Sequence, residues 1–117
     1  EQPAIEGKVA SAIIKIRVNG VTKIAASDGE GPVHAMDLAL RAALSDFYPE
    51  IARMSLVDYK VRVLDSDKAT AAKVRVLITS ADSADSWTTV GVSEDIIEAS
   101  WIALTDSIDY ALMRRKL

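Results

Sequence analysis

The residues whose types and spacing could do chemistry stand in a glycine-rich turn that leads into a helix. Residues 27–44 read S-D-G-E-G-P-V-H-A-M-D-L-A-L-R-A-A-L, with proline near the expected start of the helix. The free backbone N–H groups of such turns often bind anions. Asp28 and Glu30 lie inside this turn and would repel a phosphate, whereas a ligand that carries its own ammonium group would not be repelled. The turn therefore favours a ligand with both charges over a simple anion.

Side chains for catalysis or metal binding are scarce elsewhere. The chain has one histidine, His34, and no cysteine, so the sequence offers no ordinary zinc-ligand spacing. A lone histidine at a helix start is more often structural or solvent-facing than a ligand. The glycine turn lacks the third glycine of a dinucleotide fingerprint and the G-K-[ST] of a P-loop. We therefore expect no catalytic residue, no metal site and no cofactor in this chain.

Two further features permit more than one interpretation. Six basic residues could share one face of a sheet: Lys15, Arg17, Lys60, Arg62, Lys73 and Arg75. Such a face could bind RNA, but RNA-binding sheets usually carry exposed stacking aromatics, so a solvated face is the favoured interpretation. Tyr59 is expected to share one face of a predicted strand with Val57, Val61 and Val63. It is either a core residue or the wall of an apolar pocket with a polar tip, and the sequence does not decide between them.

The composition is that of one globular domain with a core. Half of the 117 residues are hydrophobic, and the net charge of −3 gives no general attraction to nucleic acid or anionic lipid. No apolar run approaches the roughly 18 residues that span a bilayer. The chain begins E-Q-P-A-I-E-G-K without an initiator methionine, so we expect a piece of a longer protein. Residues 1–11 are interpreted as a linker and residues 12–117 as the domain.

Hydrophobic periodicity predicts strands and helices in alternation. The strands are expected at 12–18, 21–27, 56–64, 72–78 and 87–92, with an Asn19-Gly20 hairpin turn between the first two and a polar turn at 81–86. The first helix is expected from Pro32 to Tyr48, with an apolar face of Val33, Met36, Leu40 and Leu44. The second helix is expected to follow Ser93, which would be its N-cap. Its inward face would consist of Ile97, Trp101, Leu104, Ile108 and Leu112.

An internal repeat relates the two halves. K-I-R-V at 15–18 recurs as K-V-R-V at 73–76, and Ala35, Ala39 and Leu40 recur as Ala99, Ala103 and Leu104. Glycine precedes each helix. We therefore predict an α+β fold made of two copies of a strand–strand–helix unit, joined by the strand at 56–64 and related by a pseudo-two-fold axis.

Three motifs, in this order, resemble a known family. They are G-E-G-P-V-H-A-M-D-L-A-L-R-A-A-L, L-V-D-Y-K-V-R-V-L and W-T-T-V-G-V-S-E-D-I-I-E-A-S-W-I-A-L. Together they resemble the C-terminal regulatory domain of the 2-isopropylmalate synthase and citramalate synthase family, most of all the longer type of citramalate synthase. The resemblance covers about residues 12–113.

The resemblance implies a function. The parent enzyme would condense acetyl-CoA with a 2-oxo acid on an N-terminal (β/α)₈ barrel, absent here, which would also hold the divalent metal. The regulatory domain would consist of two βββα units, form a homodimer in the cytoplasm, and bind a branched-chain amino acid as feedback inhibitor. The resemblance implies isoleucine as that effector for a citramalate synthase and leucine for an isopropylmalate synthase. A purely structural dimerisation domain is the remaining alternative. Neither nucleic acid nor a membrane is expected as partner.

The resemblance also implies an effector site. Carried over position by position, it consists of Gly31, Val33, His34, Leu56, Tyr59, Val63, Glu94 and Ile96. His34 and Glu94 depart from the family pattern, in which these positions often carry a small residue and proline. We expect Gly31 and Pro32 to matter for the helix start as well as for binding.

Overall fold

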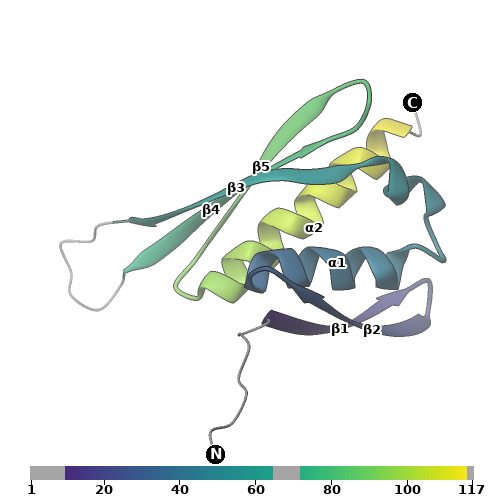
Figure 1. Ribbon diagram of the computed structural model, residues 1–117, viewed down its shortest axis with the longest axis horizontal. Coiled ribbons are helices and arrows are strands. Elements are labelled where there is room, and N and C mark those ends of the chain that lie inside the picture. Colours follow the sequence, from purple (N-terminus) through teal and green to yellow (C-terminus); the bar gives the residue numbers. More distant parts are fainter. Residues whose placement is uncertain (1–9, 65–71, 116–117) are drawn as a thin grey trace, which may run out of the picture. The chain divides into compact units, whose positions relative to one another are not determined.

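The chain is of the α+β class, as expected. A computed structural model describes residues 10–64 and 72–115, and the chain divides into two compact units, residues 1–43 and 44–117 (Figure 1). The elements in chain order are β1 (Ala10–Val18), β2 (Val21–Gly29), α1 (Pro32–Leu44), a 3₁₀ helix η1 (Pro49–Arg53), β3 (Ser55–Leu64), β4 (Lys73–Ala81), β5 (Ser86–Ser93) and α2 (Ile96–Arg115). The nine residues at the start of the predicted linker lie outside the described residues.

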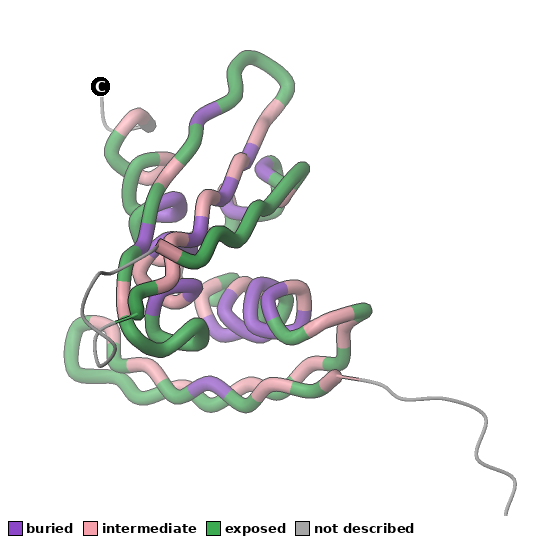
Figure 2. Tube along the Cα trace, turned by 90° about the vertical axis from the view of Figure 1, so that its left-hand side faces the viewer, coloured by how far each residue is buried: buried purple, intermediate pink, exposed green. Residues whose placement is uncertain are grey.

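The first unit begins with the predicted hairpin. β1 and β2 pair antiparallel from Ala10↔Gly29 to Val18↔Val21, and Asn19 and Gly20 adopt φ of 50° and 81° in the turn. These positive angles are what a tight hairpin turn requires. Alternation places Ile14 on the buried side, where it is the one buried residue of the ribbon (Figure 2). Ile13 lies on the opposite side and is 78% exposed.

α1 follows the hairpin and is shorter than predicted. Val33, Met36 and Leu40 are buried as expected, whereas Leu44 is half-buried. The helix ends at Leu44, whose carbonyl accepts hydrogen bonds from the N–H groups of both Phe47 and Tyr48. A separate 3₁₀ helix then begins at Pro49. The expected end at Tyr48 is therefore wrong, because the chain already leaves the helix four residues before the proline.

The second unit is a complete βββα arrangement. β3, β4 and β5 form one antiparallel sheet in the order β3-β4-β5, and α2 contacts β4 and β5 (Figure 1). β3 therefore belongs to this unit, and its prediction as a connection between two repeats is wrong. The first unit shows two strands and a helix among the described residues.

Gly91 sets the rotation of α2 on the sheet. A β-carbon at Gly91 would collide with the carbonyl oxygen of Ala99, so the backbones of helix and strand are in direct contact there. Small side chains must then face the sheet, and Ala99 and Ala103 are fully buried. Leu104 and Ile108 are buried as predicted. Ile97, predicted to point inward, is 48% exposed because the close contact turns its position away from the sheet.

The start of α2 is capped by a residue other than the one expected. Oδ1 of Asp95 accepts a hydrogen bond from the N–H of Ile97 at 2.9 Å, and its carbonyl accepts the first helical bond, from Ala99. Ser93 acts one step earlier, because its Oγ accepts from the N–H of Asp95. Asp95 is therefore the N-cap, and its charge also suits the positive end of the helix dipole.

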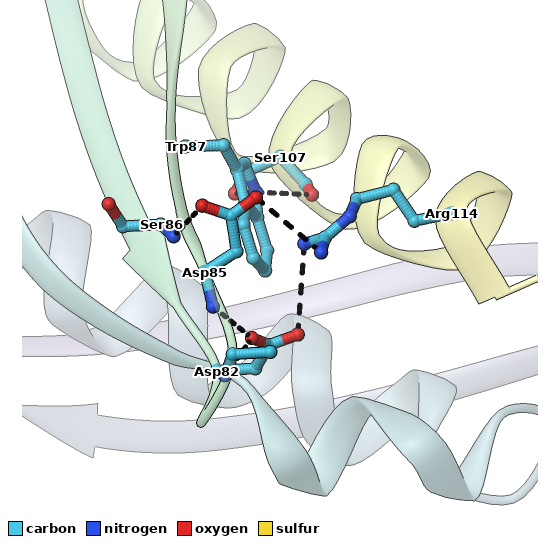
Figure 3. A network of polar contacts seen from close by, with 7 residues as sticks. Asp82, Asp85, Ser86, Trp87, Ser107 and Arg114 are labelled. Carbon is cyan, nitrogen blue, oxygen red and sulfur yellow. Dashed lines mark hydrogen bonds and ion pairs between the residues drawn. The ribbon is translucent and has the colours of Figure 1, made fainter.

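A polar cluster fastens the end of α2 to the turn between β4 and β5 (Figure 3). The guanidinium of Arg114 lies 5.3 Å from the centre of the Trp87 ring and 3.5 Å from the carboxylate of Asp85. Trp87 donates from Nε1 to the carbonyl of Ser107 at 3.1 Å. The Oγ of Ser107 also shares a 2.6 Å hydrogen bond with Ser80. Helix and sheet are therefore joined at both ends of this contact, at Gly91 and at Trp87.

The described residues contain neither a candidate membrane span nor a candidate metal cluster. None of their helices has the length and apolar character needed to cross a membrane. No group of three histidine or acidic side chains among them could hold a metal ion.

Candidate functional site

The expected effector residues are divided between the two units. Gly31, Val33 and His34 belong to the first, at the start of α1. The others belong to the second: Leu56, Tyr59, Val63, Glu94 and Ile96.

At the glycine turn, one backbone donor is already engaged. Nδ1 of His34 accepts a hydrogen bond from the N–H of Glu30 at 3.0 Å. The imidazole therefore takes a place that an external anion could otherwise use, and a nitrogen that accepts must be unprotonated. Among the described residues, the N–H groups of Gly31 and Val33 have no hydrogen-bond acceptor, so these two donors are unpaired. Val33 itself is 3% exposed, so its side chain belongs to the core of the first unit.

Gly29 is the glycine of this turn that no other residue can replace without a collision. A β-carbon there would collide with the backbone of Ala35, whereas one at Gly31 would meet open space. Gly31 also has no positive φ. The expectation that Gly31 is needed for the helix start is therefore wrong. The constraint comes from the close packing of the end of β2 on the first turn of α1, which the sequence pattern did not show.

On β3, a bulge changes which side chains share a face. The register shifts between Leu56 and Asp58, so Leu56 pairs with Ser80 and Tyr59 pairs with Ile78. Ser80 and Ile78 are buried on the side of α2, so Leu56 and Tyr59 lie on that side too. Val57, which was expected to share the face of Tyr59, is the residue that the bulge displaces.

Tyr59 is not part of the buried core. α2 contacts β4 and β5, and the α2 side of β3 stays open, with Tyr59 44% exposed and Val63 64% exposed. Of the two interpretations that the sequence left open for Tyr59, core packing does not hold for the single chain. An exposed aromatic ring within an apolar row is available to a ligand or a partner.

The strand spreads three of the expected residues along its length. Leu56 and Val63 are seven positions apart, which is about 23 Å at the usual rise of a strand. Val63 pairs with Val74, which pairs with Ser93, so Val63 lies at the sheet end where Glu94 precedes α2 and Ile96 begins it. Leu56 lies at the other end and Tyr59 between them. One amino acid cannot contact both Leu56 and Val63.

The basic residues do not share one face. Lys15 and Arg17 belong to the sheet of the first unit. The other four lie on the β3-β4-β5 sheet, on the face opposite α2: Lys60, Arg62, Lys73 and Arg75. A hollow of about 390 Å³ opens on that face, lined by Lys60, Val61, Arg62, Arg75 and Leu77. The repeated K-x-R-x pattern indicated the face, but only the strand pairing brings the two arginines together.

Comparisons with known proteins give a consistent result. The family described as "LeuA allosteric (dimerisation) domain" matches residues 4–112. The chain is 54% identical over 103 residues to the (R)-citramalate synthase of Aquifex aeolicus and 48% identical over 112 residues to that of Synechocystis. These alignments cover 88% and 96% of the chain. It is 30% identical over 111 residues, 95% of the chain, to the 2-isopropylmalate synthase of Aquifex aeolicus.

The chain spans only a part of these relatives. It covers 20% of the length of each of the three proteins. Their activity is therefore that of proteins about five times as long.

Proposed function

Because the chain belongs to the LeuA allosteric (dimerisation) domain family, we propose that it is the regulatory domain of a citramalate synthase and binds an end-product branched-chain amino acid. The observation that carries this proposal is a contrast within one organism. The chain is 54% identical to the citramalate synthase of Aquifex aeolicus and 30% identical to the 2-isopropylmalate synthase of the same organism. That contrast favours the citramalate enzyme as the parent.

The parent enzyme would join acetyl-CoA to pyruvate, on the way to isoleucine. Its catalytic residues and its divalent metal would belong to a barrel outside this chain. The chain itself would sense isoleucine, form a homodimer, and reduce the activity of the barrel when the end product accumulates. We place this process in the cytoplasm, without nucleic acid or membrane as partner.

Each unit, taken by itself, offers groups that suit one part of an amino acid. The carboxylate suits the two unused N–H groups at Gly31 and Val33, near the positive end of the α1 dipole. The branched side chain suits the apolar side of β3, where Tyr59 is exposed. Tyr59 and Val63 are the strand residues that we assign to the effector, because Leu56 lies too far along β3 from Val63 to contact the same ligand.

We also propose that the two units are copies of one ancestral unit. In each unit a glycine at or near the end of a strand meets the backbone of an alanine on the following helix: Gly29 with Ala35, and Gly91 with Ala99. These two alanines occupy matching positions in the repeat seen in the sequence. This shared contact supports the duplication, and the pseudo-two-fold relation stays a prediction.

Titration of the 117-residue chain with isoleucine, leucine and valine tests the function. Isoleucine should bind most tightly, and valine, one methylene smaller, should bind roughly 10- to 200-fold more weakly at most. Tighter binding of leucine would favour the 2-isopropylmalate synthase alternative. A folded chain that binds none of the three would be a purely structural dimerisation domain, and the effector proposal would be wrong.

A further inference from the structure

The face of the β3-β4-β5 sheet that points away from α2 carries an unusual pair. Arg62 on β3 stands directly opposite Arg75 on β4. Directly opposed residues of an antiparallel pair have their β-carbons about 5 Å apart, and like charges in that position destabilise the sheet. This arrangement therefore has a cost that a bound anion would remove.

The two arginines are part of a larger positive cluster. Lys60 and Lys73 lie on the same face, two positions from Arg62 and Arg75 along their strands. None of the four makes an ion pair with another residue of the described ranges, where Asp58 is the one carboxylate on this face. The whole chain has a net charge of −3, so the positive potential here is local.

One donor of this cluster is buried without an acceptor. Nε of Arg75 is covered and has no hydrogen-bond partner among the described residues. Leaving a charged donor buried and unsatisfied costs free energy. Arg75, Arg62 and Lys60 line the hollow of about 390 Å³ described above. That volume lies in the usual range of small-molecule sites.

We propose that this hollow binds a small polyphosphate, in which two linked phosphates are held by the guanidinium groups of Arg62 and Arg75. Arginine presents a planar fork of donors that matches phosphate oxygens in pairs. Lys60 supplies a further charge, and Leu77 forms an apolar floor. No aromatic residue of β3, β4 or β5 lies on this face among the described residues, so the recognised group is the phosphate chain and not a stacked base.

The first measurement is calorimetric titration of the 117-residue chain with tripolyphosphate, ATP and adenosine, at low salt and at physiological salt. Tripolyphosphate and ATP should bind with similar affinity, and adenosine should not bind. Binding should weaken at higher salt, as expected for contacts between charges at a surface. Adenosine binding as tightly as ATP would overturn the proposal.

A pair of double variants separates a built site from general charge attraction. R62Q/R75Q removes the two guanidinium groups, and K15Q/R17Q removes the same charge from the sheet of the other unit. R62Q/R75Q should weaken tripolyphosphate binding at least about tenfold, since the two guanidinium groups supply the charge-assisted hydrogen bonds to the phosphates. K15Q/R17Q should leave it unchanged. Equal weakening by both variants would overturn the proposal.

Folding is checked by the melting temperature without ligand. Because R62Q/R75Q removes two opposed like charges, it should melt no lower than the parent chain. If it melts several degrees lower, the test uses the single variant R75Q together with the NMR chemical-shift changes that tripolyphosphate causes in the parent chain. Shifts that gather on the methyl groups of Leu77, Val90 and Val92, which lie on the basic face, support the site, and shifts confined to other residues overturn it. Binding of single-stranded RNA without binding of tripolyphosphate would also overturn it.

Discussion

Tyr59 shows that the face to which a side chain points and the burial of that side chain have different physical causes. The alternation of L-V-D-Y-K-V-R-V-L correctly predicts that Tyr59 shares a face with Val61 and Val63. Burial depends instead on what covers that face, and α2 lies over β4 and β5. The bulge before Asp58 then exchanges Val57 for Leu56 on the α2 side. Both the bulge and the cover are tertiary features, so the sequence pattern alone leaves Tyr59 undecided.

Tyr59→Ala should remove most of the affinity for isoleucine while changing the free energy of unfolding by less than about 1 kcal/mol, because the side chain is already 44% exposed. Tyr110→Ala is a matched control. Tyr110 is 45% exposed, but its ring lies 5.6 Å from that of Trp87 and 5.7 Å from the guanidinium of Arg114. It should lose about 0.5–1.5 kcal/mol of stability and keep its effector affinity.

The measurement is isoleucine titration and thermal melting of both variants, with Tyr59→Phe to isolate the hydroxyl. If Tyr59→Ala binds isoleucine like the parent chain and only melts earlier, Tyr59 is a structural residue. The effector would then have to bind elsewhere.

At the scale of elements, the helices are placed by glycine contacts more than by their apolar stripes. The stripe of the second helix predicts that Ile97 points inward, yet Ala99 and Ala103 take the sheet side. A stripe of large side chains would hold the helix away from the sheet, and Gly91 allows backbone contact instead. Two spaced alanines and a strand glycine are the sequence signal for such packing, and both halves of the chain contain it.

Gly91→Ala should therefore destabilise the chain strongly, by about 1–3 kcal/mol, since the new methyl group must displace the backbone of α2. Gly31→Ala is the opposing control. Its β-carbon meets open space and its φ is not positive, so lower entropy of the unfolded chain should stabilise by up to about 1 kcal/mol. Urea unfolding of both variants measures the two changes in the free energy of unfolding, which should have opposite signs. If Gly31→Ala lost as much stability as Gly91→Ala, the close contact between Gly91 and α2 would not explain the effect.

For the whole molecule, the sequence predicts local structure well and long-range placement poorly. All five strands and the Asn19-Gly20 turn are confirmed, because alternation and positive φ are local properties. The end of α1, the cap at Asp95 and the side of α2 that faces the sheet differ from the predictions. Each of these depends on a competing contact that the pattern does not contain. The opposed arginines are likewise visible only once β3 and β4 are paired. The effector residues, carried over by resemblance, stay a prediction.

The last prediction concerns self-association through β3. Its α2 side exposes Val61 between Tyr59 and Val63, so an interface centred on Val61 would adjoin the residues assigned to the effector, and the family is described as a dimerisation domain. An exposed apolar row of this kind is a typical protein interface, and symmetric pairing is the usual form. The chain should sediment as a dimer at roughly tens of micromolar.

Val61→Glu should shift the chain to a monomer, because pairing would bury the new charge without a partner. Val90→Glu is the matched control. Val90 is on the same sheet and similarly exposed, 46% against 40%, but lies on the opposite, basic face. It should leave the dimer intact. Sedimentation equilibrium of the parent chain and both variants measures the association. A parent chain that is monomeric at that concentration would contradict an interface on the α2 side of β3. A Val90→Glu variant that dissociates as Val61→Glu does would contradict it too.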